Sequence, residues 1–373
     1  MNIIGYIKKY GKLSFSSMPF NEIDSLILCQ LSYLNFDPYC PAYKDFKKHP
    51  IRLKNIKIKN KKAFYSLTVT PAPMKTLMNE LVKTRRFGNV KVGYVHNVFD
   101  EEKICQFYAL TFFLSDGSMY IAYRGTDTTL LGWKEDFLFT YVDEVSSQKL
   151  ANEYAHTMLE AFPNNVYFGG HSKGGNLAMY SAFKMGRENE NRLIKVYSFD
   201  GPGFRTGKKT FESFDRTCPK IEKYITQNDI VGMIYIIMEN TKIVNSTGLL
   251  IGGHDPFYWQ ILNDRPEFKY CTDRKRGSKV MQQALTNWLT SLTLEDKKLL
   301  VDGIFQLFRA SKTVFDLRVL AIRDIVFNKK AMEKYTKVEQ IKLRMYLENF
   351  IRYYFDAFFN FKEDKKKVEN KEK

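Results

Sequence analysis

The chain has 373 residues, of which 44% are hydrophobic and 27% are charged, and its formal net charge is +17. This composition excludes disorder over most of the chain, because the apolar content is sufficient for a large core. No apolar run approaches the roughly 18 residues that a membrane-spanning helix needs, and the N-terminus lacks the pattern of a signal peptide. Five dispersed cysteines with no CxxC pair argue against a structural zinc site and favour a reducing compartment. We therefore expect a cytoplasmic protein.

Helix and strand patterns alternate over roughly the first 275 residues. Apolar residues at helical spacing predict a helix in FNEIDSLILCQLSYL. A Ser115-Asp116-Gly117 turn between two apolar runs predicts a β-hairpin over Gln106–Asp127. The following patterns predict, in chain order, a helix over Ser147–Ala161, a strand at NVYFGG, a helix over Lys173–Met185, a strand at LIKVYSF, a strand before QNDIVG and a buried strand over Ile230–Met238. Such alternation is typical of an α/β fold with a mostly parallel sheet flanked by helices.

The sequence changes character near residue 275. From Lys279 onward the pattern is helical throughout, and TLED (Thr293–Asp296) is typical of a helix N-terminus. The last stretch, KEDKKKVENKEK, mixes charges of both signs and is typical of disorder. We therefore expect an α/β domain over 1–275, an all-α C-terminal extension over 276–361 and a disordered charged tail over 362–373.

The segment NVYFGGHSKGGNLAMY contains the clearest chemical motif. Gly170-x-Ser172-x-Gly174 lies between a predicted strand and a predicted helix, which is the context of a nucleophile elbow. In such a turn the glycines permit a very tight bend that exposes the serine hydroxyl. The alternative is a glycine-rich strand-helix turn without chemistry, and the GxxxxGK[ST] spacing of a phosphate loop is absent. Ser172 is therefore the candidate nucleophile.

A serine nucleophile needs a base, and α/β-hydrolases order the triad as serine, acid and histidine. Of the five histidines, only His254 lies in a separate segment after Ser172, in the glycine-rich stretch GLLIGGHDPFYW. A solvent-exposed loop histidine is the alternative interpretation. His171 adjoins the serine, so we expect it to have a structural role.

Two aspartates compete for the acid of the triad. Asp229 follows a predicted strand in KYITQNDIVG, and Asp200 ends the preceding strand in YSFDGPGF. The acid usually follows a later strand than the one beside the elbow strand, which favours Asp229. Asp200 would otherwise cap the tight DGPG turn.

The oxyanion hole requires two donors. One is the backbone N–H of the residue after the nucleophile, here Lys173, and the other comes from the end of an earlier strand. Thr126 in the RGTD segment has both a backbone N–H and a hydroxyl to offer. A polar strand end without a catalytic role is the alternative for Thr126.

Several segments together carry a family resemblance. RGT at a strand end, a tryptophan-containing segment, GHSxGG, an NDxV aspartate and a late histidine resemble the class 3 lipases. With PFNEIDSLILCQLSYLNF, QFYALTF, DGPGF and HDPFYW, the chain resembles more closely a bacterial family of lipase-like proteins of unassigned function within the α/β-hydrolase superfamily, over roughly residues 1–310.

This resemblance implies an α/β-hydrolase-like fold over 1–275 and a set of site residues. By resemblance, Ser172, Asp229 and His254 form the triad, and Thr126 and Lys173 form the oxyanion hole. The lipases have no aspartate that matches Asp200, and their elbow usually has an apolar residue in place of Lys173.

These features favour a serine hydrolase that cleaves a carboxylic ester, with a lipid-like substrate. This reaction needs no metal ion and no cofactor. The alternatives are a catalytically inactive binding protein with the same fold, and a nucleic-acid-binding protein. The latter rests on positive charge alone, because the sequence contains no nucleic-acid-binding motif.

The positive charge suggests a further partner, an anionic membrane surface. The segment Pro41–Lys62 holds one acid among many lysines and arginines, and such clusters bind anionic lipid weakly and in a salt-sensitive way. Near the C-terminus, an aromatic helical face is either a membrane-binding face or a face that packs on the protein; its residues are Phe350, Tyr354, Phe358 and Phe361.

Overall fold

The computed structural model describes residues 1–207, 210–235, 238, 241–248, 250–309 and 332–369. The chain forms two compact units. The first consists of Met1–Thr128 and Glu144–Arg274, and the second of Thr129–Asp143 and Lys275–Lys373. The unit boundary at 274/275 lies next to the end of the predicted α/β domain, whereas the segment Thr129–Asp143, expected inside that domain, groups with the second unit.

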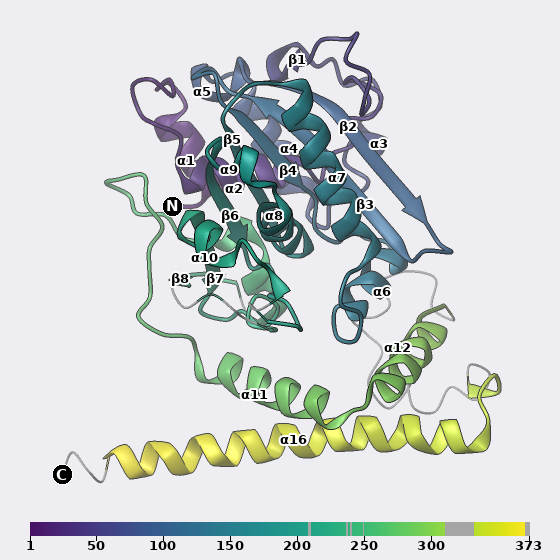
Figure 1. Ribbon diagram of the computed structural model, residues 1–373. Coiled ribbons are helices and arrows are strands. Elements are labelled where there is room, and N and C mark those ends of the chain that lie inside the picture. Colours follow the sequence, from purple (N-terminus) through teal and green to yellow (C-terminus); the bar gives the residue numbers. More distant parts are fainter. Residues whose placement is uncertain (208–209, 236–237, 239–240, 249, 310–331, 370–373) are drawn as a thin grey trace. The chain divides into compact units, whose positions relative to one another are not determined.

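An eight-stranded sheet with strand order β1 to β8 is the framework of the first unit (Figure 1). Strands β1 to β4 are antiparallel, and each pair from β4 to β8 is parallel. The strands are β1 (Ile51–Arg52), β2 (Lys91–Asp100), β3 (Cys105–Phe113), β4 (Met119–Tyr123), β5 (Val166–His171), β6 (Leu193–Phe199), β7 (Ile221–Thr226) and β8 (Lys242–Val244).

The helices of the first unit lie on both faces of this sheet. Along β4, Tyr120 and Ala122 belong to one buried cluster, and Ile121 and Tyr123 to the other, because successive side chains of a strand point to opposite faces. Helices α1, α2 and α4 contribute to the first cluster, and α7 and α8 to the second. The helices are α1 (Ile3–Tyr10), α2 (Glu22–Leu31), α3 (Lys61–Phe64), α4 (Pro71–Leu81), α5 (Arg85–Gly88), α7 (Ser146–Ala161), α8 (Lys173–Lys184), α9 (Arg187–Glu190) and α10 (Phe214–Thr217).

This architecture confirms the predicted fold class, an α/β-hydrolase-like, mostly parallel sheet flanked by helices with a helical C-terminal part. The hairpin β3–β4 and the succession α7, β5, α8, β6 and β7 also lie where the sequence predicts them. The strand predicted over Ile230–Met238 is wrong for the described residues, since 230–235 form bends and turns. There the carbonyls of Ile234 and Tyr235 accept hydrogen bonds from the N–H groups of Gly203 and Phe204.

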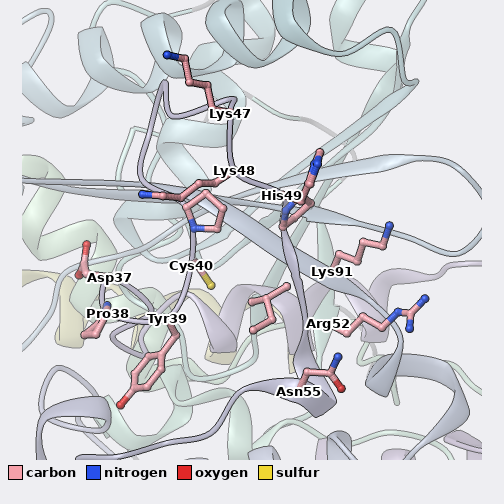
Figure 2. A pocket seen from close by; sticks show the side chains of 13 residues that line it. Asp37, Pro38, Tyr39, Cys40, Lys47, Lys48, His49, Arg52, Asn55 and Lys91 are labelled. Carbon is pink, nitrogen blue, oxygen red and sulfur yellow. The ribbon is translucent and has the colours of Figure 1, made fainter.

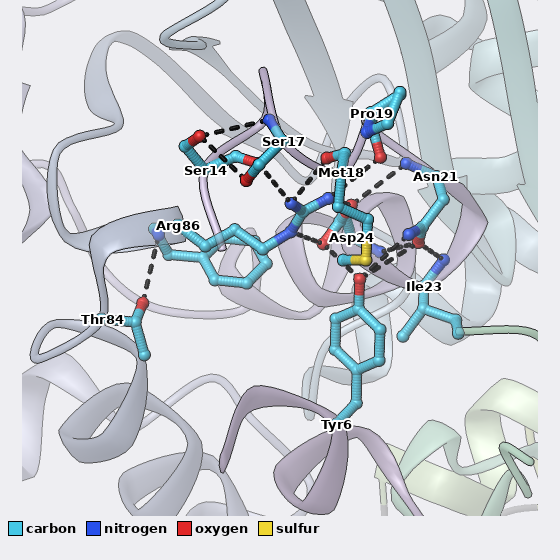
Figure 3. Close-up of polar contacts among 11 residues, drawn as sticks. Tyr6, Ser14, Ser17, Met18, Pro19, Asn21, Ile23, Asp24, Thr84 and Arg86 are labelled. Atoms are coloured by element: carbon cyan, nitrogen blue, oxygen red, sulfur yellow. Dashed lines mark hydrogen bonds and ion pairs between the residues drawn. The ribbon is translucent and has the colours of Figure 1, made fainter. Parts of the chain in front are cut away.

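Within the first unit, a buried ion pair between Asp24 of α2 and Arg86 of α5 joins these two helices (Figure 3). Arg86 Nε donates to Asp24 Oδ1 at 2.7 Å, and the second Arg86–Asp24 contact involves Oδ2. The Tyr6 hydroxyl donates to Asp24 Oδ1 at 2.9 Å, and the Asn21 N–H donates to Oδ2 at 3.0 Å. Both side chains of the pair are fully buried, so hydrogen bonds must replace the water that each charge loses.

The described part of the second unit is helical. Its helices there are α6 (Leu130–Leu138), α11 (Arg276–Ser291), α12 (Leu294–Arg309) and α16 (Lys337–Glu369). Helix α6 packs on α12 through Phe137 and Phe305, whose ring centroids lie 5.6 Å apart. Trp288 of α11 donates its indole N–H to the carbonyl of Tyr346 in α16 at 2.8 Å. These contacts explain why the segment that contains α6 groups with the C-terminal helices.

The C-terminal predictions have mixed outcomes. The TLED motif does begin a helix, since Thr293 Oγ1 accepts from the N–H of Asp296 at 3.1 Å. The predicted aromatic face packs within its unit, because Phe350, Tyr354 and Phe358 lie against Val280 and Ala284 of α11. The side chain of Phe361 lies outside the described residues.

The charged tail also differs from its prediction. Helix α16 continues to Glu369, so residues 362–369 are helical in the structure, and the last four residues lie outside its described part. Among the described helices, none combines the length and apolarity needed to cross a bilayer.

Candidate active site

Ser172 stands at a sharp turn between β5 and α8, as the elbow motif predicts. Its backbone has φ 57° and ψ −129°, a left-handed conformation that costs free energy for any residue with a Cβ. The glycines around it are required by close backbone approach. A Cβ on Gly170 would lie 2.1 Å from the Gly174 carbonyl oxygen, and one on Gly174 would lie 2.2 Å from the Tyr123 oxygen. Strain held in this way by the surrounding backbone is typical of a functional residue.

Helix α8 begins directly after Ser172. The first N–H groups of a helix point out of its N-terminus, where the helix dipole favours negative charge. Ser172 itself is partly exposed, whereas Lys173 is buried. Lys173 Nζ donates to the backbone oxygen of Gln106 at 2.7 Å and to its Oε1 at 2.8 Å. The Lys173 side chain is therefore held by β3, and its contribution to an oxyanion hole would come from its backbone N–H.

Gly125 connects the RGTD segment to the elbow. A Cβ on Gly125 would lie 2.5 Å from the His171 oxygen and 3.2 Å from Ser172 Cβ. The backbone next to Thr126 therefore runs against the nucleophile turn, and Thr126 is partly exposed. The structure thus brings the end of β4 and the elbow together, as an oxyanion hole built from Thr126 and Lys173 requires.

His254, in the short 3-10 helix η4 (Leu250–His254), reaches a carboxylate at the end of β6. Its Nδ1 lies 3.0 Å from Asp200 Oδ2 and 3.9 Å from Asp229 Oδ1. The imidazole is 21% exposed, whereas both carboxylates are fully buried. The hydrogen bond of His254 therefore goes to Asp200. Asp229, which the strand order favours as the acid of the triad, is the more distant carboxylate.

Each aspartate is also fixed by the backbone. Asp200 Oδ1 accepts from the Thr226 N–H at 3.0 Å, and Asp229 Oδ1 accepts from the Val231 N–H at 3.0 Å. Asp200 adopts φ 48°, a second strained residue at a strand end, next to the strand that carries Ser172. Strain at both strand ends again points to a functional arrangement.

The pKa values of these carboxylates and of the nearby Lys223 are strongly shifted from their ordinary values. Burial raises the pKa of Asp200 well above its ordinary value, and burial together with the charge of Asp200 raises the pKa of Asp229 to about 8. Burial lowers the pKa of the Lys223 ammonium to about 8, against the opposite influence of the two aspartates. The Lys223 Nζ donates to the Gly201 carbonyl. Such perturbed groups beside a partly exposed imidazole are typical of active sites.

His171 and Tyr33 support the segment that carries His254. His171 Nε2 lies 2.9 Å from the carbonyl oxygen of His254, and its Nδ1 lies 3.3 Å from the Tyr33 hydroxyl. The two imidazole centroids are 4.5 Å apart, so the ring of His254 lies close to the residue that precedes Ser172. Burial lowers the pKa of His171 well below its ordinary value, so the ring is neutral. Sequence reasoning missed Tyr33, and no local motif signals it.

One group of potential metal ligands occurs among the described residues. The ligand atoms of His171, Asp200 and His254 lie within 4.8 Å of one another. Their hydrogen bonds already join Asp200 to His254 Nδ1 and His171 Nε2 to the His254 carbonyl. These hydrogen bonds account for the grouping, and we propose no metal there.

A separate cavity of about 840 Å³ lies near β1, and none of the candidate triad or oxyanion-hole residues lines it. Basic side chains surround it (Figure 2). Lys47, Lys48, Arg52 and Lys91 are all exposed. The cavity thus includes part of the basic segment Pro41–Lys62 that the sequence analysis singles out.

Comparison with known proteins places the chain in a family. The family model described as Mbeg1-like matches residues 81–306, which include β2 to β8 and every candidate site residue. The chain belongs to the Mbeg1-like family. Together with the sheet topology, this membership confirms the resemblance to lipase-like α/β-hydrolases. A search of curated proteins finds no match.

Two solved structures similar to this Mbeg1-like chain are lipases. One is the crystal structure of M37 lipase, with 16% identity and a TM-score of 0.36, over 57% of this chain and 70% of that chain. The other is lipase II from Rhizopus niveus, with 14% identity and a TM-score of 0.32, over 46% of this chain and 69% of that chain. At these values the two likenesses carry no argument about the site or its activity.

Proposed function

We propose that this protein is a serine hydrolase that cleaves carboxylic esters. The observation that carries the proposal is that the strained Ser172 elbow and Asp200 follow the ends of the neighbouring parallel strands β5 and β6, and that Asp200 contacts His254. A structural turn does not need a serine held at φ 57°, and a solvent-exposed loop histidine does not need two buried carboxylates.

In the proposed reaction, the Ser172 hydroxyl attacks the ester carbonyl carbon and its proton passes to His254. Because Nδ1 of His254 is committed to Asp200, Nε2 is the nitrogen that accepts this proton. The backbone N–H of Lys173 and a donor of Thr126 stabilise the oxyanion. The imidazolium then protonates the leaving alcohol, and water activated by His254 hydrolyses the acyl-enzyme.

The orienting acid in this proposal is Asp200, with Asp229 as a second carboxylate beside it. Two negative charges in a buried place are costly, so the two aspartates share one charge opposite Lys223. This arrangement differs from a triad in which Asp229 alone holds the histidine. A distance of 3.0 Å supports a hydrogen bond to Asp200, whereas 3.9 Å to Asp229 is too long for one.

The proposed substrate class is a lipid-like ester, cleaved by a protein that binds weakly to anionic membrane surfaces from the cytoplasm. The basic cavity near β1 supports the second part, since clustered lysines and arginines attract anionic headgroups. A soluble short-chain ester is the competing substrate class. Comparing nitrophenyl esters of short and long acyl chains would separate the two classes.

A fluorophosphonate probe tests the proposed nucleophile directly. We expect the wild-type chain to be labelled and peptide mapping to find the label on Ser172. Ser172→Ala should abolish labelling with an unchanged circular dichroism spectrum. Ser181→Ala is the control, because Ser181 is a buried serine of helix α8, which follows Ser172, and its loss should leave labelling intact.

Two outcomes would contradict the proposal. Labelling of a serine other than Ser172 would assign the nucleophile elsewhere. A folded wild-type chain that neither reacts with the probe nor hydrolyses any ester would instead indicate a catalytically inactive binding protein with an α/β-hydrolase fold.

A further inference from the structure

The exposed side of helix α16 carries an apolar stripe. Its apolar members are exposed by 46 to 67%: Val338, Ile341, Met345, Phe355 and Phe359. The opposite side of the helix is buried within the second unit, where Leu343, Tyr346 and Ala357 pack on other residues of that unit. Helix α16 is therefore apolar on two sides, of which one is buried and the other is exposed to solvent.

The spacing of this stripe is that of a coiled coil. With Glu348 and Arg352, which are also exposed, the stripe occupies positions 338, 341, 345, 348, 352, 355 and 359. These positions alternate steps of three and four residues, which is the a/d pattern of a two-stranded coiled coil. The stripe covers three heptads, or about 32 Å at 1.5 Å per residue.

The two charged positions determine how a second copy would fit. In a parallel pair in register, Glu348 would face Glu348 of the other copy and Arg352 would face Arg352, so the contact would be repulsive. In an antiparallel pair centred at residue 350, Glu348 faces Arg352 of the second copy, and the reverse pair forms by symmetry. Polar residues inside a coiled-coil stripe commonly fix register and orientation.

The same antiparallel register also matches the remaining positions. It places Met345 opposite Phe355 of the second copy and Ile341 opposite Phe359, so these layers of the stripe are apolar on both sides. At the flanks, Ile351 lies beside Ile351 of the second copy close to the two-fold axis, and Lys342 lies near Asp356 of the second copy. A pattern that is complementary to itself under a two-fold rotation is what an isologous dimer interface requires.

We propose that the protein forms a symmetric dimer through antiparallel pairing of α16, with Glu348–Arg352 pairs at its centre. A lipid surface fits this stripe less well, because the carboxylate of Glu348 lies in the middle of the apolar face. The proposal does not depend on the hydrolase activity, since all of the residues that carry it belong to the second unit.

Sedimentation velocity of the full chain tests the proposal, with concentrations from about 1 to 100 µM. We expect a reversible monomer–dimer equilibrium. Glu348→Arg and Arg352→Glu should each weaken dimerisation at least tenfold, because each change places two like-charge pairs at the centre of the interface. The double variant Glu348→Arg/Arg352→Glu should restore the dimer, since it only exchanges the partners.

A mixture of the two single variants gives a sharper result. One variant then has only positive charges at the centre and the other has only negative charges, so we expect a heterodimer where each variant alone is monomeric. Glu333→Arg is the matched control, because it reverses an exposed charge of the same unit outside the stripe. Its dimer should be as stable as that of the wild type.

The proposal is overturned if the wild-type chain remains monomeric at 100 µM, or if neither single variant weakens its dimer. It is also overturned if the single variants dissociate but the double variant stays monomeric. Two other occupants of the stripe would be recognised by their own signals. A monomer whose melting temperature falls with Phe355→Glu would indicate cover from within the chain, and a monomer whose binding to vesicles is lost with Phe355→Glu would indicate a membrane; either result overturns the dimer.

Discussion

Two buried carboxylate clusters in the first unit have similar burial but different partners. Asp24 is held by Arg86, by Tyr6 and by the Asn21 N–H. Asp200 and Asp229 lie around a partly exposed imidazole, and the nearby ammonium of Lys223 donates to a backbone carbonyl. In the first cluster, the charge of Arg86 balances that of Asp24. In the second cluster, two carboxylates lie near the His254 imidazole, which can take up a proton.

This difference separates a structural ion pair from a candidate catalytic one. A buried carboxylate with a bidentate guanidinium has little reason to change its charge during function. Keeping the carboxylates of Asp200 and Asp229 buried side by side costs folding free energy, which the rest of the fold must supply. Such a cost is typical of functional sites. Removing a charge should therefore have opposite effects on stability at the two places.

The largest expected effect is the loss of ester hydrolysis that Asp200→Asn causes. An amide keeps the geometry but favours the wrong imidazole tautomer, which lowers turnover by about 10⁴ in serine hydrolases. Asp229→Asn should lose much less, because His254 Nδ1 lies 3.9 Å from it. Turnover of a nitrophenyl ester by both variants measures the difference. A larger loss for Asp229→Asn would make Asp229 the acid of the triad and would contradict the role given to Asp200.

The next effect is on the structural cluster. Arg86→Ala would leave the carboxylate of Asp24 buried without its cation, which costs about 3–5 kcal/mol of unfolding free energy. Urea unfolding measures it. The double variant Arg86→Met/Asp24→Asn removes both charges and should recover part of the loss. If Arg86→Ala alone unfolds like the wild type, Asp24 is not held by this pair.

The elbow could be predicted from sequence because all of its determinants are local. Gly170, Ser172 and Gly174 are contiguous with the strand and helix that they join, and each glycine is required by its own backbone contacts. The pairing of His254 with Asp200 could not be predicted in this way. Asp200 and Asp229 both follow strands, and only the three-dimensional position of η4 determines which carboxylate meets Nδ1.

Other differences have the same physical origin. The apolar run at Ile230–Met238 has no periodicity that separates a strand from a turn, and its described residues 230–235 form bends and turns beside the DGPG segment. The contact of Tyr33 with His171 joins residues that are 138 positions apart. Packing between distant segments therefore determines which carboxylate contacts His254, whereas local patterns already single out Ser172, His254, Thr126 and Lys173 as candidates.

A smaller effect is the pH dependence of stability. Because the pKa of Asp229 is raised to about 8 in the folded state, the folded chain binds more protons than the unfolded chain between about pH 4 and 8. The free energy of unfolding therefore falls as pH rises through this window, by at most about 1.4 kcal/mol per pH unit for this group.

Asp229→Asn removes the contribution of Asp229 to this pH dependence. Relative to the wild type, the variant should gain stability between about pH 5 and pH 7. The substitution should keep the local backbone contact, because the Val231 N–H can donate to an amide oxygen as well as to the carboxylate oxygen that it contacts in the wild type. Urea unfolding at the two pH values measures the gain. An equal difference between variant and wild type at both values would show that Asp229 titrates as an ordinary carboxylate.

The smallest effect concerns charges that are not buried at all. Arg52 lies exposed at the rim of the basic cavity near β1 (Figure 2), where solvent already compensates its charge, so its removal should not change stability. Each basic residue near an anionic membrane contributes about 1 kcal/mol. Arg52→Gln should therefore weaken binding to anionic vesicles about fivefold at low salt.

Lys83→Gln is the matched control, because Lys83 is exposed but pairs with Glu80 at 3.3 Å, and the Lys83→Gln variant should bind as the wild type does. Co-sedimentation with anionic and neutral vesicles, at low and high salt, measures both. Equal binding to the two lipids, or an equal loss in the two variants, would contradict a membrane role for the cavity and would favour a small soluble ester as substrate.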